Sequence, residues 1–285
     1  MEEYRARAYA KINLGLDVIG RLPNGYHQVR MIMQQIDLYD ELTFKRIEDG
    51  IVIVSGSDDI PLDESNLIHK AIRHMMKTYG ISGGIRVDLE KNIPVAAGLA
   101  GGSTDAAAAI KAVDRLFGLN LPLSRLMEEG IVIGADVPYC ILGGTALAEG
   151  IGEKLTPLPD VPSCHILVAK PEASVSTRSV YNHLDSMVIP HHPDIDGMID
   201  SVNAGNAEGI WARMENVLEI VTIPAHPVIA SLKDRMLRLG AAGSLMSGSG
   251  PTVFGIFREE APAQDAYRAM EEEGLAKQLF LTTIL

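Results

Sequence analysis

Hydrophobic and polar positions alternate in some segments of the chain and recur with a helical period in others. Alternation and strand-forming residues predict strands at residues 5–19, 42–45, 51–54, 85–90, 165–169, 244–247, 252–257 and 279–284. Helical periodicity predicts helices at residues 65–79, 104–117, 123–129, 176–184, 206–219, 227–239 and 262–273, with Ser65 as the cap of the first. These elements do not follow a strict strand–helix–strand period, so the predicted fold class is α+β.

A proline-rich segment predicts a domain boundary near the middle of the chain. Pro157, Pro159 and Pro162 fall within residues 155–162, and such clusters are common in linkers. We therefore expect an N-terminal domain over residues 1–158 and a C-terminal domain over residues 159–285. A tight turn is expected at residues 22–25, because Asn24-Gly25 readily adopts the positive φ angles of a sharp reversal.

Composition narrows the possible partners and the compartment. The formal net charge is −12, which disfavours a nucleic-acid partner, although an acidic protein can still bind phosphate locally through backbone amides. The two cysteines, Cys140 and Cys164, form no CxxC pair and exclude a disulfide framework or a four-cysteine metal site. A signal peptide and an apolar run of about 20 residues are both lacking, so we expect a cytoplasmic protein without a membrane partner.

The sharpest chemical signal is a run of small residues that leads into the helix predicted at residues 104–117. The run consists of Pro94, Val95, Ala96, Ala97, Gly98, Leu99, Ala100, Gly101, Gly102, Ser103 and Thr104. Bare backbone amides can converge on an anion in such a loop, and the positive end of the helix faces the same place. Ser103 and Thr104 add hydroxyl donors or cap the helix. The alternative is a small-residue turn packed tightly against a sheet.

Two ionisable residues occur in apolar surroundings. Lys11 lies in the strand predicted at residues 5–19, and Asp136 lies in the apolar segment 131–142. Burying either charge alone costs on the order of several kcal/mol, so each is the natural partner of the other. Such a pair is either catalytic or purely structural. Asn13 follows Lys11 by two positions and is expected on the same face of the strand.

The small-residue loop is neither a Walker A loop nor a dinucleotide fingerprint, and it resembles the phosphate loop of the GHMP kinase superfamily. Two further motifs of that superfamily are present in order, one around Lys11 and Asn13 and one at Gly248, Ser249 and Gly250. The resemblance implies a two-domain kinase with an N-terminal domain like the second domain of ribosomal protein S5 and a C-terminal ferredoxin-like domain. It also implies ATP as co-substrate, accompanied by Mg²⁺.

Further segments are similar to one branch of the superfamily, which phosphorylates a cytidine diphosphate sugar alcohol in the non-mevalonate isoprenoid pathway. They are Asn24-Gly-Tyr26-His27, Gly134-Ala-Asp136-Val-Pro138 and Leu245-Met-Ser-Gly-Ser-Gly-Pro251. The reaction implied is transfer of the γ-phosphoryl group of ATP to the 2-hydroxyl of the methylerythritol part. The alternatives are a kinase of the homoserine or mevalonate type, which the Tyr26-His27 pair argues against, and a non-catalytic nucleotide-binding relative.

The resemblance also implies roles for individual residues. Asp136 is the expected catalytic base, with Lys11 as its supporting cation, and Asn13, Tyr26, His27 and Thr177 are the expected substrate-binding residues. Asn66 and Lys91 match positions that flank the adenine, although a helix-start Asn and an exposed Lys also have simple structural explanations. Gly248, Ser249 and Gly250 would support the phosphate loop, and Ser103 or Thr104 could contribute to binding Mg²⁺.

Some features of the sequence depart from the family or invite another interpretation. Ala100 replaces a frequent Gly or Ser, and Thr104 replaces the usual Ser, but both changes are small. His191 and His192 suggest a metal site, yet adjacent side chains point in different directions, so a surface loop is the favoured interpretation. The quaternary structure expected is a monomer or a homodimer.

Overall fold

Two long strands, β1 (Glu3–Arg21) and β2 (His27–Ile47), pass through both compact units of the chain in the computed structural model, which describes residues 2–23 and 25–285. The first unit comprises Met1–Ala10, Leu38–Val95 and Ala100–Gly143, and the second comprises Lys11–Asp37, Ala96–Leu99 and Gly144–Leu285. The units interleave in sequence and do not divide the chain at one point. The domain boundary at residues 158 and 159 stays a prediction.

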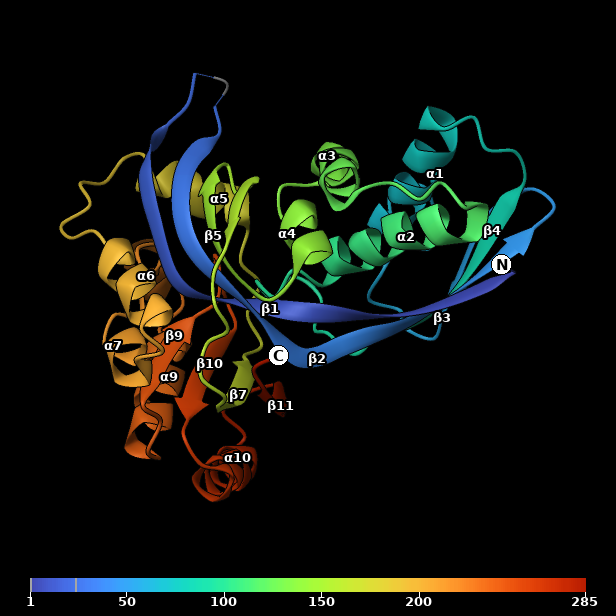
Figure 1. The fold of residues 1–285 in the computed structure, drawn as a ribbon. Helices are drawn as coiled ribbons and strands as arrows, with labels where there is room; N and C mark the ends of the chain where they lie inside the picture. Colours follow the sequence, from blue (N-terminus) through green and yellow to red (C-terminus); the bar gives the residue numbers. More distant parts are fainter. Residues whose placement is uncertain (1, 24) are drawn as a thin grey trace. The chain divides into compact units, whose positions relative to one another are not determined.

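In the first unit, a sheet carries helices on one face. The end of β2 pairs antiparallel with β4 (Gly84–Glu90), which pairs in parallel with β3 (Gly50–Ser55). The helices α1 (Leu67–Thr78), α2 (Gly101–Phe117), α3 (Leu123–Ile133) and α4 (Val137–Leu142) lie over this sheet (Figure 1). Leu42, Phe44 and Val87 are buried beneath them, while the alanine-rich face of α2 permits close packing.

In the second unit, strands added to β1 and β2 accompany a separate four-stranded sheet. The strand β5 (Thr145–Gly150) pairs with β2 and with β6 (Lys154–Pro157), and β8 (Glu215–Asn216) pairs with β1. The second sheet has the order β11-β7-β10-β9 and consists of β7 (His165–Lys170), β9 (Gly243–Met246), β10 (Val253–Phe257) and β11 (Gln278–Thr283). All of its pairs are antiparallel.

The second sheet has ferredoxin-like topology, because α9 (Val228–Arg238) precedes β9 and α10 (Glu260–Glu273) joins β10 to β11. The remaining helices of the unit are α5 (Thr177–Leu184), α6 (Ile195–Asn203), α7 (Ala207–Trp211) and α8 (Glu219–Ala225). The α+β class and the ferredoxin-like C-terminal part are therefore confirmed.

Several sequence predictions need correction. Residues 206–219 do not form one helix, since α7 ends at Trp211 and β8 follows. The helix predicted at residues 104–117 begins earlier, at Gly101, so Ser103 and Thr104 lie inside it and do not cap it. Asn66, and not Ser65, caps α1. The predicted turn at residues 22–25 includes Asn24, which lies outside the described residues; Gly25 N donates to Leu22 O at 2.9 Å.

Candidate active site

The small-residue loop leads from β4 into α2 through an unusual backbone. Ala96, Gly98 and Ala100 all have positive φ angles, of 52°, 77° and 58°. Asn120 is the other non-glycine residue with positive φ in the part of the chain that the structure describes. An alanine in this conformation is strained by about 1–3 kcal/mol, and such strain is characteristic of functional segments.

The start of α2 presents backbone amides that the protein itself does not use. The first bond of the helix runs from Thr104 N to Ala100 O at 2.9 Å, and Ala100 caps the helix without a side-chain hydrogen bond. Within residues 2–23 and 25–285, the amides of residues 98–103 donate no backbone hydrogen bond to the protein. These amides and the positive end of a 17-residue helix make a binding site for an anion such as phosphate.

Gly98 is packed against the glycine-rich segment at residues 248–250. The Ser247 hydroxyl donates to Gly98 O at 3.0 Å, and a Cβ on Gly98 would lie 2.3 Å from Ser247 O. The φ of Gly248 is also positive, and a Cβ there would lie 3.4 Å from Gly98 O. Only glycine fits at position 98, where the two backbones approach each other. The structure thus brings together the two glycine-rich segments that the sequence singled out.

Two residues that the sequence analysis missed hold the 248–250 segment in place. Asn216 is buried on β8, and its Nδ2 donates to Met246 O and Gly248 O, both at 2.8 Å. Thr222 donates to Ser249 O at 3.3 Å. Both lie in or beside residues 206–219, whose helical pattern concealed the irregular backbone in which Asn216 lies. Thr177, a predicted substrate residue, shares a 2.8 Å hydrogen bond with the Ser249 hydroxyl.

Lys11 and Asn13 lie on one face of β1, as their spacing predicted. Both are buried, and Lys11 Nζ donates to Asn13 Oδ1 at 2.7 Å. Lys11 N also donates to Leu99 O at 3.1 Å, so the strand is tied directly to the phosphate loop. A Cβ on Gly248 would lie 3.6 Å from Lys11 Nζ, which places the ammonium beside the glycine-rich segment.

Asp136 occupies the N-terminus of α4, where it is half-buried. Burial raises the pKa of Tyr139 in the same helix, and the Cys140 thiol and the Asp136 carboxylate add to that rise. Lys11 belongs to the second unit and Asp136 to the first. Their pairing as catalytic base and supporting cation stays a prediction.

His27 is held by residues of α5 and its C-terminus. Its Nε2 lies 2.6 Å from Asp185 Oδ1, and a carboxylate can only accept, so Nε2 is the donor. Arg21 Nη1 lies 3.1 Å from the other oxygen of Asp185, and the Tyr181 ring packs at 4.7 Å from the imidazole. Tyr26 is 57% exposed. Asp185 and Tyr181 were not predicted, because they lie more than 150 positions from His27.

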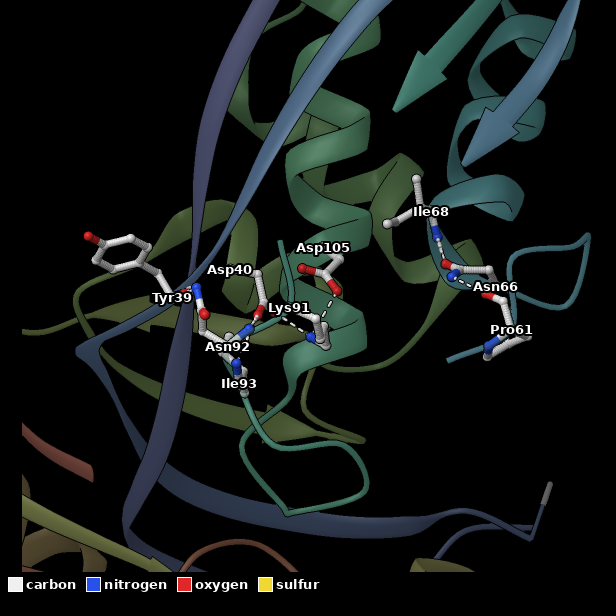
Figure 2. Close-up of polar contacts among 9 residues, drawn as sticks. All are labelled: Tyr39, Asp40, Pro61, Asn66, Ile68, Lys91, Asn92, Ile93 and Asp105. Carbon is white, nitrogen blue, oxygen red and sulfur yellow. Dashed lines mark hydrogen bonds and ion pairs between the residues drawn. The ribbon is translucent and has the colours of Figure 1, made fainter. Parts of the chain in front are cut away.

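Lys91 is not exposed, contrary to the sequence analysis. Its ammonium lies between the carboxylates of Asp40 and Asp105, and its side chain is only 5% exposed (Figure 2). Asn66 accepts a hydrogen bond from Ile68 N at 2.9 Å and donates one to Pro61 O at 2.7 Å. The oxygen and the nitrogen of its side-chain amide are therefore both hydrogen-bonded. The prediction that these two residues flank adenine is not tested by these contacts.

His191 and His192 lie in an exposed loop, as expected. His192 Nδ1 is 2.8 Å from Asp17 Oδ1, whereas His191 Nε2 is 3.3 Å from Glu215 Oε2, so each imidazole has a different carboxylate partner. Among residues 2–23 and 25–285, no group of three or more His, Cys, Asp and Glu residues could hold a metal ion. None of the helices in the same residues is long and apolar enough to cross a bilayer.

Known families and structures match both halves of this architecture. Residues 66–144 match the GHMP kinases N terminal domain, and residues 183–276 match the GHMP kinases C terminal family. The matched ranges contain the phosphate loop, Asp136 and the 248–250 segment. The chain belongs to the GHMP kinases.

More specific relatives match over nearly the full chain. A protein of Lachnospira eligens named 4-diphosphocytidyl-2-C-methyl-D-erythritol kinase is 54% identical over 99% of this chain and 98% of its own. A protein of the same name from Caldicellulosiruptor bescii is 47% identical over 98% and 97%. A crystal structure of 4-(cytidine 5'-diphospho)-2C-methyl-D-erythritol kinase covers 99% of both chains at 30% identity, with a TM-score of 0.83. A homoserine kinase from Cytophaga hutchinsonii, at 22% identity and a TM-score of 0.78, shares the fold.

Proposed function

We propose that this protein transfers the γ-phosphoryl group of ATP to the 2-hydroxyl of 4-diphosphocytidyl-2-C-methyl-D-erythritol, a step of the non-mevalonate route to isoprenoid precursors. The observation that carries the proposal is the row of unused amides at the start of α2, in a chain 54% identical to a kinase of that name. The structural likeness to homoserine kinase supports the fold alone and gives no reason to prefer homoserine as substrate.

The triphosphate would bind to the loop at residues 94–104. The amides at the start of α2 would donate hydrogen bonds to its oxygens, and Ser103, which is half-buried in the first turn, would add a hydroxyl donor or a ligand for Mg²⁺. Mg²⁺ normally keeps several waters and binds phosphate oxygens, so it fits a site with few carboxylates. The ion would neutralise charge on the phosphates during transfer.

Asp136 would act as the base and Lys11 as its supporting cation. In the transfer, the substrate hydroxyl loses its proton to Asp136, its oxygen forms a bond to the γ-phosphorus, and the bond to the β-phosphate oxygen breaks to release ADP. Asn13 is fixed by the Lys11 ammonium and so has a defined orientation toward a diol. A base held in place typically contributes about 10²–10⁴-fold to the rate.

The cytidine would be bound by Tyr26 and His27, and Thr177 would also contact the substrate. The support for this assignment is the contact of His27 with Asp185 and Tyr181, which orients a polar ring beside an aromatic face. A planar base stacks well on such a surface.

The compartment, the quaternary structure, the domain boundary and the excluded partners in this proposal come from the sequence. We infer a cytoplasmic enzyme, monomeric or homodimeric, with a boundary between its domains near residues 158 and 159. Neither nucleic acid nor a membrane is among its partners. The net charge of −12 supports the exclusion of nucleic acid.

The proposal is tested by offering purified protein ATP and Mg²⁺ with each of three alcohols, and by measuring ADP release. We expect turnover with 4-diphosphocytidyl-2-C-methyl-D-erythritol and none above background with homoserine or mevalonate. Asp136→Asn should retain nucleotide binding and lose roughly 10²-fold or more of the rate. Turnover with homoserine or mevalonate alone would refute the substrate, and an unchanged rate in the variant would refute the base.

A further inference from the structure

Three buried charged residues beside the phosphate loop have no role in the transfer described above. They are Asp40 on β2, Lys91 just after β4 and Asp105 in α2, with side chains that are 0%, 5% and 5% exposed. Buried charges are costly and seldom retained without a function or a compensating network. Figure 2 shows the carboxylates of Asp40 and Asp105 both paired with the ammonium of Lys91.

Asp40 fixes the backbone that enters the loop. The antiparallel register pairs Glu41 with Glu90, which brings Asp40 opposite Lys91 where the pairing ends. Asp40 Oδ1 accepts from Asn92 N at 2.6 Å and from Ile93 N at 2.8 Å, while Oδ2 accepts from Lys91 Nζ. The backbone amides of the two residues directly before Pro94 are therefore held by one carboxylate.

Lys91 connects that entry point to the helix that leaves the loop. Its Nζ donates to Asp105 Oδ2 at 3.0 Å, and a Cβ on Gly101 would lie only 2.9 Å from the same nitrogen. The ammonium thus lies directly against the first residue of α2. One side chain links residues 91–93 with residues 101–105, which are the two ends of the loop.

The cluster depends on Lys91 because it contains two carboxylates for one ammonium. Asp105 Oδ1 is buried and has no hydrogen-bond partner among the described residues. Burial raises the pKa of Asp105, the Lys91 charge opposes that rise, and the Asp40 charge adds to it. Removing Lys91 would leave two carboxylates facing each other without a cation, which favours separation of the loop ends.

We propose that Asp40, Lys91 and Asp105 form a clamp that holds the two ends of the phosphate loop at the spacing needed to grip a triphosphate. Lys91 is then a positioning residue that acts through the loop backbone and does not contact the adenine. The inference rests on the proposed function only in taking residues 94–104 as the nucleotide site.

The test compares ATP with inorganic tripolyphosphate, which has the phosphates but no base. Dissociation constants for both are measured by calorimetry with wild type, Lys91→Met, Lys91→Met/Asp105→Asn and the control Lys70→Met, which removes an exposed lysine of α1. Thermal melting checks that each variant is folded. Both ligands are binding probes, so the result does not depend on which alcohol the enzyme phosphorylates.

The clamp predicts that Lys91→Met weakens ATP and tripolyphosphate by the same factor, roughly 10- to 100-fold, the scale of a displaced binding group. It also predicts that the double variant recovers part of this loss and that Lys70→Met matches wild type. Weakened ATP with unchanged tripolyphosphate would mean that Lys91 contacts the base, and no weakening of either would also overturn the clamp. If Lys91→Met does not fold, the charge-balanced double variant carries the same comparison of the two probes.

Discussion

At the scale of single residues, the phosphate loop is shaped by left-handed backbone at Ala96, Gly98 and Ala100. The glycine at position 98 could be anticipated from its residue type, but the two alanines could not, because alanine seldom adopts positive φ. Their small side chains leave the amides uncovered while the surrounding contacts maintain the strain. The loop therefore has accessible backbone amides and a fixed backbone conformation.

Ala100 is the most informative position for testing that shape. We expect Ala100→Gly to keep the affinity for ATP, because glycine adopts the left-handed conformation without strain. Ala100→Val should lower the free energy of unfolding by about 1–3 kcal/mol and raise the KM for ATP, since a β-branched residue is poorly tolerated there. Urea unfolding and steady-state kinetics measure both effects. Equal behaviour of the two variants would argue against the observed loop conformation.

Asp185 is predicted to act on substrate binding through His27. Asp185→Ala removes the acceptor 2.6 Å from His27 Nε2 and should raise the KM for the cytidine substrate roughly tenfold or more, the worth of a hydrogen bond to a charged group. The KM for ATP should stay unchanged. Asp196→Ala is the matched control, since that carboxylate also pairs with an arginine but lies 79% exposed. Equal rises in both KM values for Asp185→Ala would indicate a general structural defect.

At the scale of elements, the sequence predicted the helices and strands with clear periodicity and missed segments that carry buried polar residues. The strands β4 and β7 and the end of α2 lie where they were expected. The long strand β2 was predicted only at residues 42–45, because Gln34 and Asp40 are polar yet completely buried. Gln34 is satisfied by the Thr145 hydroxyl at 2.6 Å, a contact between segments distant in sequence that no local pattern contains.

The helices α1 and α3 are joined by a buried carboxylate, Glu129. It accepts hydrogen bonds from Tyr79 and His74, and Arg125 Nη2 lies 2.6 Å from it. Burial alone would raise the pKa of Glu129, but the Tyr79 and His74 hydrogen bonds and the Arg125 charge lower it below 4.5. The carboxylate therefore stabilises the fold when ionised.

The lowered pKa of Glu129 sets the direction in which the stability of the protein changes with pH. The contribution of Glu129 is complete above about pH 4.5 and is lost as the pH falls through the lowered folded-state pKa. Glu129→Gln should reduce the free energy of unfolding by about 1–3 kcal/mol at neutral pH and by progressively less in acid. Urea unfolding at several pH values measures this, with Glu128→Gln as the exposed control. A difference between wild type and Glu129→Gln that grows in acid would contradict the assignment.

At the scale of the whole molecule, the net charge of −12 gives no general attraction for anionic substrates. Phosphate recognition must therefore be local, through amides, the helix end of α2 and a few cations. Of the residues that the sequence motifs singled out, Gly98, the 248–250 segment, Lys11 and Asn13 lie close together. Supporting residues such as Asp185 and Asn216 could not be identified, because their roles arise only from tertiary contacts.

The central claim is that the γ-phosphoryl group of ATP is transferred to one particular hydroxyl of an intact cytidine diphosphate sugar alcohol. Phosphorus NMR of the reaction mixture tests it most directly. We predict a new phosphomonoester signal that coupling to the product carbons assigns to the 2-hydroxyl, formed in step with ADP while the diphosphate signals of the substrate persist. A phosphomonoester on another hydroxyl, cleavage of the diphosphate, or ADP accompanied only by inorganic phosphate would contradict the account.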